Sequence, residues 1–152
     1  MEDLDDFQSR QSKALEYCKK RMDWYGKHRD RNRIAFQMSQ GMALTLSGLT
    51  PILILWSDLP KTIQALPAAL AAILTGLNGI FHWRDNYIIF AYTWNHLANE
   101  KIKYATRATG DYGLNVDKES GLSNFISNVD KHIINEVEEW RATRNKEARI
   151  DS

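Results

Sequence analysis

Two uncharged stretches lie back to back in the middle of the chain, and they constrain its fold more than any other feature. The first runs from Ile34 to Ser57 and the second from Thr62 to Trp83. A helix needs about 20 apolar residues to cross the hydrocarbon core of a bilayer, and each stretch reaches that length. Only residues 58–61 separate the two stretches, and so short a connection returns the second helix beside the first. The sequence therefore predicts a transmembrane hairpin, with spans at about 34–57 and 62–83.

A buried hairpin in a soluble helical bundle is the alternative, but such helices are usually shorter and amphipathic. The charged residues gather on both sides of the hairpin, in residues 1–33 and 84–152. We therefore expect one structural domain and an all-α membrane protein, whose long helices extend into a cytoplasmic helical bundle. Residues 1–33 form its N-terminal helix, and residues 84–152 form further helices around a loop at about 109–121.

Basic residues beside the hairpin predict its orientation. Lysine and arginine accumulate on the cytoplasmic side of membrane proteins, and the turn between the two spans carries only Lys61, beside Asp58. Both termini are therefore expected in the cytoplasm, and the protein in the cytoplasmic (inner) membrane. The basic residues are expected to contact anionic lipid, or alternatively an anionic ligand such as a nucleotide. They are Lys27, Arg29, Arg31, Arg33 and Arg84.

The segments outside the hairpin show helical periodicity. We expect the second span to continue as one helix to about residue 108, and its start, at Thr62 or nearer Pro67, stays open. A last helix capped by Ser120 or Ser123 is indicated by an apolar stripe. This stripe comprises Ile126, Val129, Ile133, Val137 and Trp140.

One face of the second span carries only small or polar residues, namely Gln64, Ala68, Ala71, Thr75, Asn78 and His82. Polar side chains are costly when they face lipid, so this face is expected against protein or water. It either lines a pore built from several copies or packs closely against another helix, and both interpretations stay open. Small-residue packing is also expected at Gly41, Thr45, Gly48, Gly76 and Gly79, and the small residues of the first span are expected to pack against the second span within the hairpin.

The sequence shows no pattern typical of an enzyme. The four histidines form no spaced metal motif, and no glycine-rich phosphate loop appears. The single cysteine, Cys18, excludes an intrachain disulfide and is expected to be a small packed side chain. We expect no cofactor and no metal. The net charge of +1 argues against nucleic-acid binding.

Several aromatic and acidic positions resemble a known family. The first is the Trp24-Tyr25 pair, which is followed by a basic run and by a first span with a late proline. The second is the run Trp94, Leu97, Glu100, Tyr104, Gly110 and Tyr112, and the third is the Glu139-Trp140 pair. Over about residues 15–145 the chain resembles the SLATT family of prokaryotic two-transmembrane effector domains, which are associated with nucleotide-synthesising and nucleotide-sensing systems.

The resemblance implies an effector of prokaryotic conflict systems that assembles with copies of itself and permeabilises the membrane. A separate sensor protein or a nucleotide ligand would supply the trigger. In this interpretation the family positions hold the cytoplasmic bundle together; they are Trp24, Tyr25, Trp94, Glu100, Tyr104, Tyr112 and Trp140. The competing hypothesis is a membrane-anchored interaction or scaffold module without conductance.

Overall fold

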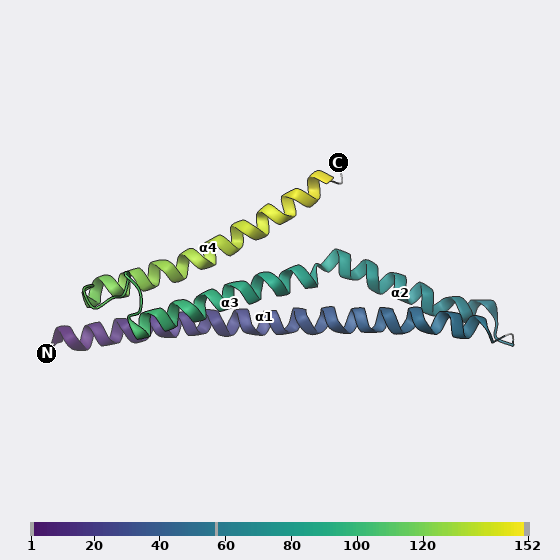
Figure 1. The fold of residues 1–152 in the computed structure, drawn as a ribbon, viewed down its shortest axis with the longest axis horizontal. Coiled ribbons are helices and arrows are strands. Elements are labelled where there is room, and N and C mark those ends of the chain that lie inside the picture. The colour runs from purple at the N-terminus through teal and green to yellow at the C-terminus, as the bar shows by residue number, and fades with distance from the viewer. Residues whose placement is uncertain (1, 57, 151–152) are drawn as a thin grey trace. The chain divides into compact units, whose positions relative to one another are not determined.

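The computed structural model describes residues 2–56 and 58–150, with side chains for all of these except 2, 3, 139 and 142–150. The described chain is all-α, as predicted. It contains four helices, α1 (Glu2–Ile54), α2 (Lys61–Phe81), α3 (Trp83–Thr106) and α4 (Lys118–Ile150), shown in Figure 1.

The chain divides into two compact units. Unit 1 comprises residues 1–27 and 89–152, and unit 2 comprises residues 28–88. The helices α1 and α3 each contribute residues to both units. The two divisions fall close to the ends of the uncharged stretches, so each unit has its own composition, charged in unit 1 and mostly apolar in unit 2.

Unit 1 is a bundle of three helical segments. Contacts pair Arg10 with Glu119 and Tyr17 with Asp130, so the first part of α1 runs parallel to α4. Gln11 lies against Tyr104, whereas Trp24 lies against Phe90, so α3 runs antiparallel to α1. The bundle closes around eight buried side chains, namely Ala14, Cys18, Tyr25, Leu97, Tyr112, Leu122, Phe125 and Val129.

Hydrogen bonds at the edge of this core fix the register between α1 and α4. The Tyr17 hydroxyl donates to Asp130 Oδ1 at 3.0 Å, and the Tyr25 hydroxyl donates to Glu136 Oε2 at 3.1 Å. Tyr25 is buried, and burial together with Glu136 raises the pKa of its hydroxyl. A hydroxyl that stays protonated keeps donating to the carboxylate, which holds the two helices together at this level.

Unit 2 is a helical hairpin. The end of α1 and the start of α2 lie side by side in Figure 1, and residues 47–54 face residues 68–75 across a shared groove. The Gln64 side chain closes the turn because its amide donates to the carbonyl oxygens of Trp56 and Leu59, at 3.2 and 3.0 Å. The structure places the start of α2 at Lys61, directly after Pro60, so Pro67 lies inside the helix and is buried.

The sequence predicts an unbroken helix beyond the second span, whereas the structure interrupts it at His82. This residue has a left-handed backbone with φ 47°, and its N–H donates to the Asn78 carbonyl at 3.2 Å. The Asn86 side chain donates to the Phe81 carbonyl at 3.2 Å, which gives a hydrogen bond to a carbonyl in the last turn of α2. The Phe81 and Trp83 rings stack across the break, with centroids 5.3 Å apart.

The last helix begins earlier than the expected serine caps. Asp117 precedes α4, and its Oδ1 accepts the Ser120 N–H at 2.7 Å while its Oδ2 accepts the Ser120 hydroxyl at 2.7 Å. These bonds to Ser120 lower the pKa of the Asp117 carboxyl. The buried face of α4 matches the predicted stripe in part: Val129 is fully buried and Ile133 packs against the core, whereas Ile126 is 40% exposed and Phe125 is buried instead.

We predict that Phe125→Ala lowers the free energy of unfolding of unit 1 by about 3–5 kcal/mol, the usual effect of removing a large buried ring. Phe125 has no exposed surface. The measurement is a urea titration of the purified chain in detergent, followed by tryptophan fluorescence. Ile134→Ala is the control, because Ile134 lies on the same helix and is 57% exposed. Equal losses in the two variants would contradict this core.

Candidate functional site

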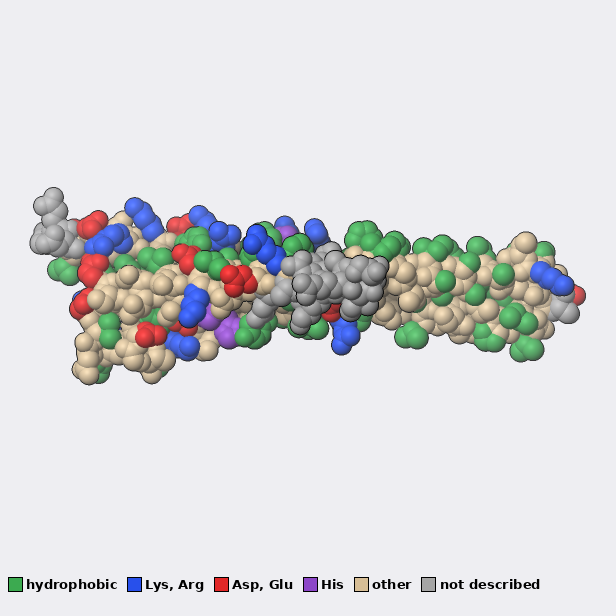
Figure 2. Space-filling model, turned by 90° about the horizontal axis from the view of Figure 1, so that it is seen from above, with side chains coloured by type: hydrophobic (Ala, Val, Ile, Leu, Met, Phe, Trp, Pro, Cys, Tyr) green, Lys and Arg blue, Asp and Glu red, His purple; other side chains and the backbone are tan. Residues whose placement is uncertain are grey.

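The outer surface of the hairpin is apolar. Large hydrophobic side chains along residues 34–81 are exposed, many of them by more than half. Figure 2 shows hydrophobic side chains along the hairpin, with basic and acidic atoms at its tip. Monomeric soluble proteins rarely expose apolar patches this continuous. The set comprises Ile34, Met38, Met42, Leu44, Leu49, Ile52, Ile54, Leu55, Trp56, Ile63, Leu66, Leu70, Ile73, Ile80 and Phe81.

One helical run in the described chain is long and apolar enough to cross a membrane, and it lies within Lys61–Thr106. Only 11% of its most apolar window is buried, unlike the core helix of a soluble protein. The expected first span in α1 does not meet the same criterion. Gln37, Gln40 and several serine and threonine residues dilute its apolar character.

The polar and small face of α2 is divided between two surroundings. Ala68, Ala71 and Thr75 line a groove of about 650 Å³ that α2 shares with α1. Gln64 closes the turn, and His82 lies at the helix break with its Nδ1 3.7 Å from Asp85 Oδ2. Part of the face therefore packs within the hairpin.

Asn78 lies one turn below Thr75 on the same face. Its side-chain oxygen is buried and accepts no hydrogen bond from any described residue. A buried amide oxygen without a donor is costly, so Asn78 is the position on this face where a polar neighbour or water would stabilise the structure most.

Three threonine hydroxyls of the hairpin are satisfied inside their own helices. Thr45 donates to the Gly41 carbonyl at 2.8 Å, Thr50 to the Leu46 carbonyl at 3.0 Å and Thr75 to the Ala71 carbonyl at 2.9 Å. Such bonds reduce the cost of placing a hydroxyl in an apolar environment.

The glycines of the hairpin make no close contact within it. Beyond the adjacent residues and the backbone of its own helix, a Cβ added at Gly41, Gly48, Gly76 or Gly79 would meet no atom of the described chain within 4 Å. They do not pack the two helices of one hairpin together. Their flat surfaces are instead open to a neighbour.

The basic residues expected near lipid are mostly exposed. Lys27, Arg31, Arg33 and Arg84 are exposed, and Arg29 is half-buried with its Nε 3.0 Å from Asp30 Oδ1. The hydrogen bond from Arg29 lowers the pKa of the Asp30 carboxyl. Four cations thus remain accessible to an anionic surface.

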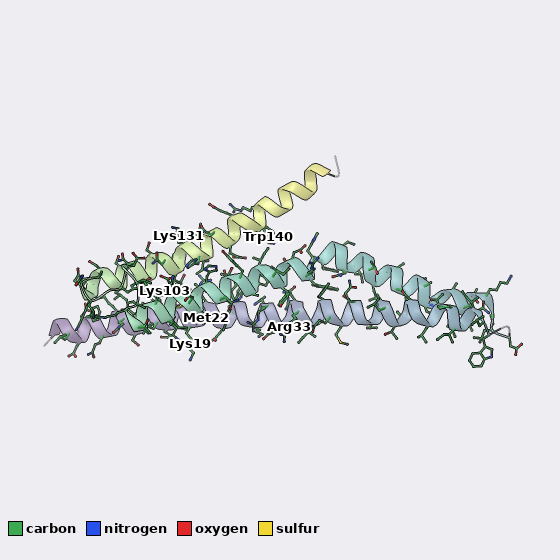
Figure 3. All side chains as sticks on the ribbon, in the orientation of Figure 1. Lys19, Met22, Arg33, Lys103, Lys131 and Trp140 are labelled. Carbon is green, nitrogen blue, oxygen red and sulfur yellow. The ribbon has the colours of Figure 1, made fainter. Side chains whose placement is uncertain are left out.

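Unit 1 contains a buried carboxylate, Glu100 on α3, which is 3% exposed. Its Oε1 accepts hydrogen bonds from the Tyr112 hydroxyl and from Asn128 Nδ2, the latter at 2.9 Å. Its Oε2 accepts a bond from Lys103 Nζ at 3.2 Å, and Figure 3 shows Lys103 on α3. The Asn128 amide also lies 3.0 Å from the Tyr112 hydroxyl, so loop 107–117, α3 and α4 meet at this point.

The electrostatics of this network favour the ionised carboxylate. Burial raises the pKa of Glu100, but the bonds from Tyr112, Lys103 and Asn128 outweigh it and hold the pKa below its ordinary value of 4.5. Burial and the Glu100 bond raise the pKa of the Tyr112 hydroxyl. The pair therefore consists of a charged acceptor and a protonated donor at neutral pH, which is the strong form of this bond.

Two histidines flank the network. The His132 ring lies 4.9 Å from the His96 ring, and its Nε2 lies 3.9 Å from Glu100 Oε2. Burial and the neighbouring His96 lower the pKa of His132, against the opposing effect of Glu100. No group of three or more potential ligands for a metal occurs in the part of the chain that the structure describes.

The aromatic family positions lie around the same core. Trp24 packs edge-on against Phe90 with centroids 5.7 Å apart, and the Trp94 indole approaches the backbone at Gly26. The Tyr104 ring stacks on Phe125 at 4.6 Å and meets Tyr112 edge-on at 5.5 Å. Trp140, labelled on α4 in Figure 3, is 41% exposed.

Sequence reasoning missed Asn128, Lys103 and His132 as members of the Glu100 network. The signal for Asn128 is its place on α4, three residues after Phe125 and next to Val129, where a polar residue interrupts a buried face. A polar residue inside an apolar stripe indicates a buried hydrogen-bond partner. The partner itself comes from α3 and cannot be read from α4 alone.

These features define a class: an all-α chain that joins a polar-networked helical bundle to an exposed apolar hairpin. Residues 20–119 match the family described as protein of unknown function DUF4231. Because this match covers more than half of the chain, the protein belongs to the DUF4231 family. No curated protein and no solved structure matches the chain.

We predict that Glu100→Gln destabilises unit 1 by about 2 kcal/mol at neutral pH, because hydrogen bonds to a charged group are lost. The folded-state pKa of Glu100 lies below 4.5. The contribution of the ionised carboxylate is therefore complete above about pH 4.5 and disappears as the pH falls through the lowered folded value. The measurement is thermal unfolding of both proteins at a series of pH values.

The difference in melting temperature between the two proteins should shrink steadily below about pH 4.5. Glu16→Gln is the matched control, because Glu16 pairs only with the exposed Lys20 on its own helix. A constant difference at every pH would show that the charge of Glu100 is not what stabilises the bundle.

Proposed function

We propose that this protein is a membrane protein whose hairpin spans the bilayer and whose copies assemble into an ion-conducting or membrane-permeabilising pore. The observation that carries the proposal is the continuous exposed apolar surface of unit 2. The hydrophobic effect opposes leaving such a surface in water, whereas lipid tails accept it. The apolar run within Lys61–Thr106 supports at least one membrane crossing.

The hairpin supports two crossings because α2 lies beside α1. Although α1 is less apolar, its hydroxyls at Thr45 and Thr50 donate to its own carbonyls. A helix whose polar groups are satisfied internally enters lipid at lower cost. Asp58 and Lys61 at the turn are the charges that would have to cross, and the basic residues at the other end would stay with both termini in the cytoplasm.

Assembly of several copies is supported by the open glycine surfaces and by Asn78. Helices approach closely in membranes where small residues form the contact, and Gly41, Gly48, Gly76 and Gly79 leave such room. Asn78 presents a buried oxygen without a donor. In an assembly, a ring of Asn78 and Thr75 side chains would give this oxygen water or a neighbouring amide.

The resemblance to the SLATT family supports a role for the pore in prokaryotic defence. We infer that the protein is an effector of a prokaryotic defence or conflict system, held in the inner membrane and opened by a separate sensor protein or a nucleotide ligand. Such a pore would stay closed at rest, because permanent conductance is toxic to its host.

Replacing Asn78 and Thr75 with leucine should abolish single-channel current across a planar bilayer that holds the purified chain. Leucine removes the polar groups from the proposed lining. Ile73→Leu is the matched control, because Ile73 lies on the opposite face of α2 and its side chain is 58% exposed. Assembly of each variant is checked by cross-linking in nanodiscs.

Current that persists in the double variant would overturn the pore lining. Loss of assembly together with loss of current would instead assign Asn78 and Thr75 to helix packing. A correctly assembled protein that never conducts would favour the membrane-anchored scaffold.

Orientation can be tested through the single native cysteine. Cys18 is fully buried, so maleimide reagents should react slowly with it in the folded protein. In whole cells, a membrane-impermeant maleimide should label Asp58→Cys and leave Ser9→Cys unlabelled, because the turn lies outside and the N-terminus inside. If Ser9→Cys is labelled in cells and Asp58→Cys is not, the orientation is the opposite of the one proposed. If neither variant is labelled in cells but both are labelled after lysis, the hairpin does not cross the membrane.

A further inference from the structure

A cavity of about 400 Å³ lies within unit 1. It forms where the start of α1, the end of α3, loop 107–117 and the first turn of α4 come together. The volume falls within the range of small-molecule sites, which are mostly apolar with a few polar groups. Elements far apart in the sequence enclose it, so it exists only in the folded bundle.

Aromatic and aliphatic side chains form most of the wall. Phe7 and Leu15 line it from α1, and Tyr104 and Tyr112 line it from α3 and the loop. The Tyr104 ring is held rigidly, because it stacks on Phe125 and its hydroxyl accepts a bond from Gln11 Nε2 at 3.1 Å. A fixed aromatic wall suits a flat apolar group, which stacks against it without reorganising the site.

The charge lining the cavity is positive. Arg107 and Lys118 line it, and neither forms an ion pair with any described residue. Asp117 also lines it, but both of its oxygens accept hydrogen bonds from Ser120. An anionic group that entered would therefore find two cations whose charges no neighbour neutralises.

The backbone at Arg107 gives a separate argument. Arg107 follows the last residue of α3 and has a positive φ of 51°. Glycine is the usual residue in this conformation after a helix, because the Cβ of any other residue crowds the following carbonyl oxygen there. Strained residues cluster at binding sites, so the strain here points to a role for the arginine side chain.

We propose that this cavity binds a small organic anion: a molecule with one flat apolar body and one acidic group. The body lies against Tyr104 and the neighbouring apolar wall, and the acidic group lies at Arg107 and Lys118. The site belongs to unit 1 alone and goes beyond the proposed pore, so it stands whether or not the hairpin conducts.

The test uses naphthalene-2-carboxylate as the probe, titrated by calorimetry into the purified chain in nanodiscs. We expect saturable binding at one site per chain. The neutral naphthalene-2-carboxamide should bind at least tenfold more weakly. Arg107→Gly should weaken the carboxylate at least tenfold and leave the melting temperature unchanged or higher, because glycine relieves the strained backbone.

A second pair of variants tests the location. Ala105 lines the cavity and is exposed, so Ala105→Trp should fill it and abolish binding without unfolding the bundle. Ala108 is equally exposed and does not line the cavity, so Ala108→Trp should bind normally. The proposal is overturned if the carboxylate does not bind the unchanged chain, or if the amide binds equally well. It is also overturned if the carboxylate binds Arg107→Gly or Ala105→Trp as well as it binds the unchanged chain.

Discussion

The cost of exposing the hairpin to water is the constraint on which the rest of the structure depends. Its large side chains point outward, because a two-helix unit has almost no interior in which to bury them. A soluble protein would add helices to cover such a surface. Here α4 and most of α3 pack in the bundle of unit 1 instead. The chain therefore covers the core residues of the bundle with its own helices, whereas the large side chains of the hairpin stay exposed.

Within the bundle, one charged group performs a task that apolar packing alone does not. Leu97, Phe125 and Val129 supply burial, which is non-directional and tolerates shifts of register. The Glu100 carboxylate instead requires Tyr112, Asn128 and Lys103 at fixed positions. Because Tyr112 belongs to the connection between α3 and α4, the network also fixes the loop. The walls of the adjacent cavity owe their position to the same bonds.

The fold class and the helical nature of each segment followed from the sequence because they depend on local patterns. Long uncharged stretches, helical spacing and the turn at Pro60 are all readable along the chain. The break at His82 was not, because neither proline nor glycine marks it in the sequence; it depends on one side-chain hydrogen bond, from Asn86 to the Phe81 carbonyl, and on ring stacking across the break. On α4 the predicted stripe and the buried face share Val129, but Phe125 is covered in place of Ile126, since both are apolar and only the packing of α1 and α3 decides between them. The outward-facing glycines likewise could not be predicted, because small residues suit a close contact equally well within a hairpin and between hairpins.

The internally bonded threonines also determine what the hairpin offers to its surroundings. Each hydroxyl of Thr45, Thr50 and Thr75 donates its one hydrogen bond to a carbonyl one turn earlier. What remains on the outside of each oxygen is a lone pair, so these positions accept hydrogen bonds and do not donate them. Wherever such oxygens meet water, they attract its hydrogen atoms and present partial negative charge, although residues 34–57 and 62–83 include no acidic residue.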